Sequence, residues 1–64
     1  MYEQDRLMDC NELAKYLGVT PDTLGVYRTK GVGPKYIKIG RVIRYRVGDV
    51  RDWLDQKART KTFM

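Results

Sequence analysis

Residues 9–21 read DCNELAKYLGVTP, and this stretch marks where one helix begins and ends and where the next one begins. Asp9, whose side chain is a hydrogen-bond acceptor, is followed three positions later by Glu12. This spacing is typical of a capping box, which predicts that a helix begins at Cys10. Apolar residues then recur on one helical face until Gly18, a residue type that favours the left-handed conformation at a helix end. A threonine before Pro21 is a typical N-cap, because proline at the first helical position has no amide hydrogen to leave unsatisfied. The stretch therefore predicts two helices joined by a short turn.

The second helix is predicted over residues 21–30, because Gly31 and then Gly33-Pro34 prevent its continuation. This order of helix, short turn and helix has the spacing of a helix-turn-helix motif, in which the second helix lies in a groove of DNA. An ordinary helical hairpin has the same spacing. The spacing by itself leaves both interpretations open.

Beyond Pro34 the periodicity changes from that of a helix to that of strands. The apolar members of the alternating pattern are Ile37, Ile39, Ile43 and Tyr45. Gly40-Arg41 is expected to form the turn of a hairpin whose apolar side packs on the helices. The outward side is then expected to carry the basic residues Lys38, Arg44 and Arg46.

A third helix is expected from Gly48, with acidic residues in its first turn and basic residues in its last, as the helix dipole favours. Together these elements predict an α+β fold, a small winged helix-turn-helix with the order α-α-β-β-α. Residues 1–64 are expected to form this one domain, because the chain is too short for two hydrophobic cores. Residues 1–6 and 60–64 have no hydrophobic period and are expected to be flexible ends.

The composition excludes several classes of protein. One Cys and no His leave too few ligands for a zinc site, so we expect no metal and no cofactor. Without His or Ser, and with scattered carboxylates, the chain is not expected to be an enzyme. It has no apolar run of membrane-spanning length and no signal peptide, which predicts a cytoplasmic protein without a membrane partner.

The excess positive charge lies in the middle of the chain. The net charge is +5, but residues 1–22 carry −3, whereas residues 23–48 have seven basic residues and no acidic one. An asymmetry of this size is the electrostatic footprint expected for a polyanion such as nucleic acid. A solvated strip of surface charge is the simpler alternative.

Four motifs follow one another in a family-specific order: LAKYLGVT at 13–20, GPKYIKIGR at 33–41, RYR at 44–46 and DVRDWL at 49–54. In this order the chain resembles the small MerR-like winged helix-turn-helix proteins of the phage and mobile-element excisionase type. The resemblance implies binding to double-stranded DNA, with the second helix in the major groove and the hairpin tip over the adjacent minor groove or backbone.

The resemblance also implies a function and partners. The function is that of an excisionase-like architectural factor in site-specific recombination, with an integrase or recombinase and further copies of the chain on adjacent DNA sites as partners. A small transcription regulator that uses the same surface is the first alternative. A protein-interaction module that docks an acidic partner is the second.

The centre of the second helix departs from the family, which usually has a large or basic pair where this chain has Gly25-Val26. A glycine inside a helix costs about 1 kcal/mol of stability relative to alanine. Gly25 therefore either permits a close approach of the backbone to DNA or is merely tolerated.

The residues expected to contact DNA lie on the second helix and on the hairpin. The set is Thr20, Asp22, Thr23, Val26, Arg28, Thr29, Lys30, Lys38, Arg41, Arg44 and Arg46. Thr23 is the expected polar contact, and Val26 is placed to pack on a thymine methyl group or, alternatively, at the periphery of the core. Asp22 is expected as a partner of the helix dipole, with a hydrogen bond from cytosine N4 as the alternative. Arg41 is expected to enter a narrow minor groove, with a solvated turn charge as the alternative.

The strip of basic residues is expected to make about five phosphate contacts in total; its members are Arg28, Lys30, Lys38, Arg41, Arg44 and Arg46. Arg28 is expected to bury its stem against Tyr27 and Tyr45 while its head reaches the DNA backbone. For Lys38, Arg44 and Arg46, an ion pair with Asp49 or Asp52 is the alternative. Four aromatic residues are expected in the core and not on a stacking platform: Tyr16, Tyr27, Tyr45 and Trp53.

Overall fold

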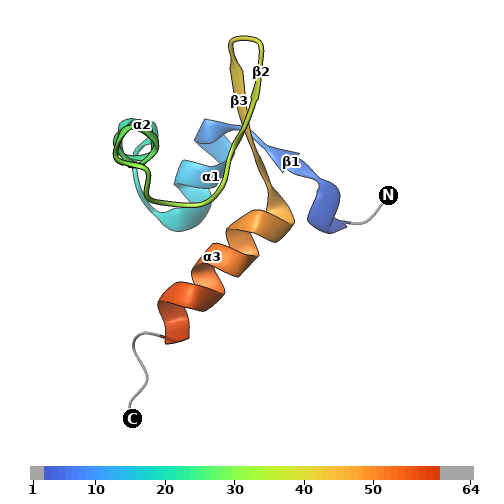
Figure 1. The fold of residues 1–64 in the computed structure, drawn as a ribbon, viewed down its shortest axis with the longest axis vertical. Coiled ribbons are helices and arrows are strands. Elements are labelled where there is room, and N and C mark those ends of the chain that lie inside the picture. The colour runs from blue at the N-terminus through green and yellow to red at the C-terminus, as the bar shows by residue number, and fades with distance from the viewer. Residues whose placement is uncertain (1–2, 60–64) are drawn as a thin grey trace.

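The computed structural model describes residues 3–59, so the predicted flexible end at 60–64 lies outside the described residues. In chain order the elements are η1 (Glu3–Asp5), β1 (Leu7–Met8), α1 (Cys10–Leu17), α2 (Pro21–Lys30), β2 (Ile37–Ile39), β3 (Val42–Arg46) and α3 (Val47–Arg59). The predicted order α-α-β-β-α is confirmed, with a short strand added in front of it. In Figure 1 the β2–β3 hairpin projects at one end of the molecule and α3 extends toward the other.

The first two helices begin and end where the sequence predicts. The Asp9 side chain accepts a hydrogen bond from the Glu12 amide at 2.7 Å, and the Glu12 side chain accepts one from the Asp9 amide at 3.2 Å. The Thr20 hydroxyl accepts from the Thr23 amide at 3.3 Å and so caps α2. Gly18 ends α1 in the left-handed conformation, with φ of 76°. These local caps fix both helix boundaries.

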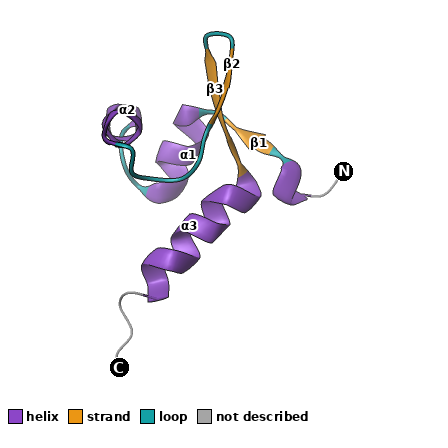
Figure 2. Cartoon of the chain, viewed as in Figure 1, coloured by secondary structure: helices purple, strands orange, loops and turns teal. Residues whose placement is uncertain are grey.

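The strands form one antiparallel sheet in the order β1-β3-β2 (Figure 2). In β1, Leu7 pairs with Arg46 of β3, and Met8 pairs with Tyr45. The sequence pattern did not predict this strand, because two residues are too few to show a period. β1 makes β3 the central strand of the sheet.

The prediction that Lys38 shares one face of the hairpin with Arg44 and Arg46 is wrong. Gly40 and Arg41 form a two-residue turn, so that Ile39 pairs with Val42 and Lys38 pairs with Ile43. Directly paired residues lie on the same face of a sheet, and successive residues alternate between faces. Lys38 therefore lies on the face opposite to both arginines.

The same register corrects the prediction for the apolar residues of the hairpin. Ile37 and Ile39 lie on the face of Arg44, whereas Ile43 and Tyr45 lie on the other face. Only the second pair was placed correctly against the helices: Tyr45 is 1% exposed and Ile43 packs on the core, whereas Ile39 is 55% exposed. For Ile39 and Ile43 to lie on the same face, the turn between the strands would need three residues instead of the two observed, Gly40 and Arg41.

A small core lies where α1, α2, β3 and α3 meet. Its buried residues are Met8, Leu13, Ala14, Leu24, Tyr45 and Val50. The prediction of a core position is confirmed for Tyr45, and Tyr27 packs against the core at its edge, with its ring centroid 6.4 Å from that of the half-buried Trp53. For Tyr16 the prediction is wrong, because its side chain is 64% exposed.

The segment before β1 packs against the start of α3, although no regular element was expected there. The Val47 amide donates a hydrogen bond to the Arg6 carbonyl at 2.9 Å. The Arg6 guanidinium forms an ion pair with Glu12 at 2.9 Å. A side chain at Gly48 would lie 3.2 Å from the Gln4 carbonyl oxygen, so the glycine permits this close packing. Within residues 3–59, every helix is too short or too polar to cross a membrane.

Candidate nucleic-acid interface

Two elements carry most of the predicted site residues: α2 and the wing, by which we mean the β2–β3 hairpin with its turn, residues 37–46. In Figure 1 the tip of the wing stands clear of the helices, and α2 is seen nearly end-on beside α1. Both elements thus present surface that the core does not use. The charged residues of the central segment, 23–48, lie on these two elements and on the loop between them.

The outer surface of α2 is mixed in character. Asp22, Thr29 and Lys30 are exposed, and Val26 is 49% exposed, whereas Leu24 is completely buried. An exposed valine on this helix can contact an apolar group such as a thymine methyl. The exposed fraction of Val26 excludes the alternative that it belongs to the core.

The three threonine hydroxyls of this region all have partners within the protein. The Thr20 and Thr23 hydroxyl oxygens are 3.0 Å apart, and Thr29 donates a hydrogen bond to the Gly25 carbonyl at 3.1 Å. Thr23, the predicted base contact, is half-buried. Because a hydroxyl has one donor and two acceptor positions, these groups keep some capacity for DNA.

The wing carries basic side chains on both of its faces. Lys38, Arg41 and Arg46 are exposed, and Arg44 is half-buried, with its guanidinium donating to the Ile43 carbonyl at 2.9 Å. The alternative role foreseen for Arg46 is present in the structure, since its guanidinium lies 3.9 Å from the Asp49 carboxylate. At that distance and exposure the ion pair is weak, so Arg46 can exchange it for a phosphate.

The tip of the wing is a glycine turn. Gly40 has a φ of 62°, a conformation that two-residue hairpin turns with glycine at the first position use. Arg41 follows it and is exposed. Ile39 and Val42, which pair across the turn, are 55% and 42% exposed. The tip therefore presents one cation between two apolar side chains.

Arg28 points into the protein, although its position on α2 suggested a phosphate contact. Its guanidinium donates a hydrogen bond to the Tyr45 hydroxyl at 2.7 Å and one to the Cys10 sulfur at 3.5 Å. Its Cζ atom lies 5.9 Å from the centre of the Tyr36 ring. The hydrogen bond to Tyr45 raises the pKa of Arg28 above its ordinary value. The sequence predicted the stem of Arg28 against Tyr45 and its head at the DNA backbone, but not the contacts of the guanidinium with Tyr45, Cys10 and Tyr36.

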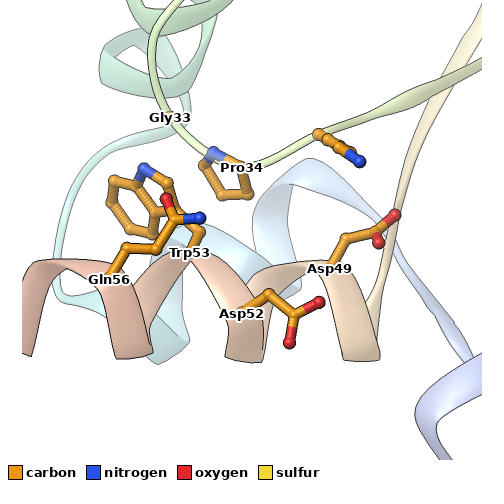
Figure 3. A pocket seen from close by; sticks show the side chains of 7 residues that line it. Gly33, Pro34, Asp49, Asp52, Trp53 and Gln56 are labelled. Atoms are coloured by element: carbon orange, nitrogen blue, oxygen red, sulfur yellow. The ribbon is translucent and has the colours of Figure 1, made fainter.

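A hollow of about 280 Å³ lies between α3 and the loop that joins α2 to β2 (Figure 3). It is lined by Gly33, Pro34, Lys35, Asp49, Asp52, Trp53 and Gln56. Its two carboxylates would repel a phosphate. The described residues, 3–59, contain no cluster of three or more side chains suited to hold a metal ion. Because two carboxylates line the hollow, this side of the molecule does not extend the basic surface of α2 and the wing.

Comparison with known proteins agrees with this geometry. A family model described as a helix-turn-helix domain matches residues 7–58, from the start of β1 into the last turn of α3. No curated protein matches the chain. Because the matched region contains both helices of the motif and the wing, we conclude that the chain belongs to this helix-turn-helix family of small DNA-binding domains.

Proposed function

We propose that the protein binds double-stranded DNA in a sequence-specific manner through α2 and the wing, and that it is a non-catalytic, excisionase-like architectural factor in site-specific recombination. The observation that carries the DNA surface is the combination of an exposed α2 with a wing that is basic on both faces. The excisionase role rests on the order of motifs by which the chain resembles MerR-like excisionases.

In this proposal the two elements contact DNA in different ways. The outer side of α2 lies in the major groove, where Val26 contacts a thymine methyl and Lys30 a phosphate. The wing lies over the adjacent minor groove with Arg41 at its tip. Because Lys38 and Arg44 lie on opposite faces of the wing, they reach the phosphates on the two sides of that groove.

The proposed role needs bending and assembly, but no chemistry. Copies of the protein on adjacent sites bend the DNA, so that an integrase or recombinase can bridge distant sequences. In this proposal the protein acts on DNA in the cytoplasm of a bacterial or phage-infected cell.

A transcription regulator that uses the same surface is the alternative, and footprinting separates the two functions. The protein is titrated onto the attachment region of its own element and onto the nearest promoter. The excisionase proposal predicts several adjacent, directly repeated sites that fill in sequence, with a bend that grows with occupancy. A single inverted repeat at the promoter, with half-sites about one helical turn apart, would contradict it and favour a dimeric regulator.

The third function considered, docking of an acidic protein, is tested by competition. If the basic surface serves DNA, excess duplex should release any acidic polypeptide that the protein captures. Binding that is insensitive to competitor duplex would support a protein-interaction module instead.

A further inference from the structure

Arg28 connects α2 with β3, two elements that share the core but are not among the most closely packed pairs. The closely packed neighbours of β3 are α1, α3, β1 and β2, whereas α2 packs closely against α1. From α2, the Arg28 side chain reaches Tyr45 on β3, and it also contacts Cys10 at the start of α1. It lies over Tyr36, which directly precedes β2. One side chain of α2 thus contacts strand β3 of the wing, the start of α1 and the residue before β2.

The contact between Arg28 and Tyr45 is a strong one by its chemistry. Tyr45 is 1% exposed, and the hydroxyl of a buried tyrosine needs a hydrogen-bond partner. A charged donor at 2.7 Å is at the short end of the usual range, and such hydrogen bonds are stronger than those between neutral groups. The Tyr36 ring, whose centroid is 6.4 Å from that of Tyr45, adds a face on which the guanidinium rests.

We infer that Arg28 is a positioning residue: it holds α2 at a fixed distance and angle from the wing, and it supports DNA binding through that geometry instead of through a phosphate contact. The inference rests on the proposed DNA surface of α2 and the wing. A protein that contacts DNA through two linked elements binds tightly only when both elements can reach their sites on the DNA at the same time. Holding the two elements in the bound arrangement before DNA arrives lowers the entropic cost of binding.

The test uses substitutions on both sides of the contact. Arg28→Met removes the donor and keeps much of the stem, Tyr45→Phe removes only the hydroxyl, and the double variant removes both. Arg28→Lys keeps one donor and the charge. The matched control is Lys30→Met, an exposed cation in the same last turn of α2.

Affinity is measured by fluorescence anisotropy on a duplex that the wild-type protein selects from a randomised pool. Each titration is repeated over a series of salt concentrations, at a temperature where circular dichroism shows the variant to be folded. We expect Arg28→Met and Tyr45→Phe each to lower the affinity about tenfold or more, in keeping with the loss of a hydrogen bond to a charged group. The double variant should be no weaker than the weaker single variant, and Arg28→Lys should recover part of the loss.

The dependence of affinity on salt separates positioning from contact. The slope of log K against log salt should be unchanged by Arg28→Met and Tyr45→Phe, whereas Lys30→Met should make it shallower by about 0.9 if Lys30 contacts a phosphate. Arg41→Ala should also cost less in the Arg28→Met background than in the wild type, because a wing held loosely contributes less. A protein in which Arg28 is only structural would bind equally well once folded and would show no such coupling.

Two results would overturn the inference alone, on a wild-type protein that binds duplex DNA. One is a slope made shallower by about 0.9 in Arg28→Met with no effect of Tyr45→Phe, which would make Arg28 a phosphate contact. The other is unchanged affinity in both variants. A wild-type protein that binds no duplex at all would overturn the proposed function together with this inference.

Discussion

At the scale of single residues, Gly25 lies in the middle of α2 with room for a side chain. A Cβ atom there would lie 3.7 Å from the end of the Arg28 side chain, which is an ordinary van der Waals distance. Its φ is not positive, so alanine fits the backbone without strain. Nothing within the described protein requires glycine at this position. The two interpretations that remain are that the glycine is tolerated and that it admits the DNA backbone.

We predict that Gly25→Ala raises the free energy of unfolding by about 1 kcal/mol, because alanine is the better helix former. Urea denaturation followed by circular dichroism measures this change. Duplex affinity, measured on the same variant, decides the role of the glycine: a loss indicates a close approach to DNA, and an unchanged value indicates tolerance. A decrease in stability would show that the site is more crowded than its geometry indicates.

Arg41 allows the second prediction at this scale. Arg41→Ala should cost about 1–3 kcal/mol of binding free energy if the guanidinium enters a minor groove, with the largest loss on duplexes that have A·T-rich flanks. Lys35→Ala, which removes an exposed cation before the wing, is the matched control and should show no dependence on the flanks. An equal loss for Arg41→Ala on every duplex would make Arg41 a phosphate contact.

At the scale of the elements, the loop between α2 and β2 depends on a second glycine that the structure does require. Gly33 has a φ of 85°, and a Cβ atom there would lie 3.0 Å from the Tyr27 ring. Gly33→Ala should therefore destabilise the protein by about 1–3 kcal/mol, through backbone strain and displacement of the ring. Urea denaturation beside Gly25→Ala gives the comparison, since the two substitutions should have opposite signs. A neutral Gly33→Ala would mean that the loop adapts freely.

The helices were predictable from the sequence because their boundaries depend on local hydrogen bonds. The caps at Asp9 and Thr20 and the glycine at 31 act within a few residues, and both α1 and α2 have the predicted bounds. Tyr16 was misplaced because helical spacing sets it near the apolar face of α1, whereas the core contacts that helix through Leu13 and Ala14.

The sheet was less predictable because its details depend on distant parts of the chain. The turn at Gly40-Arg41 was correct, but one residue in the length of a hairpin loop decides which face each side chain takes. β1 exists only through its pairing with β3, which lies more than thirty positions away in the chain. The sequence was enough to predict that the basic residues of the candidate site lie on the second helix and the hairpin. The inward direction of Arg28 did not, because it depends on the tertiary position of Tyr45.

At the scale of the whole molecule, the positive charge of the central segment is carried by α2, the loop after it and the wing. The exposed cations Lys30, Lys38, Arg41 and Arg46 are on α2 and the wing, and Asp22 is the one acidic residue of these two elements. A long-range field of this kind guides a polyanion to one side of a protein. Phosphate contacts then hold the protein on DNA, and contacts to the bases select the sequence.

The salt dependence of duplex binding shows whether α2 and the wing form a DNA-binding surface. With Arg28 directed into the protein, five basic residues remain to neutralise phosphate charge: Lys30, Lys38, Arg44 and Arg46 by direct contact, and Arg41 from within the minor groove. Each neutralised phosphate contributes about −0.9 to the slope of log K against log salt. We therefore expect a slope near −4.5 for the wild-type protein, measured by fluorescence anisotropy. A slope shallower than about −2, or no binding to duplex DNA at low salt, would contradict a DNA-binding surface on α2 and the wing.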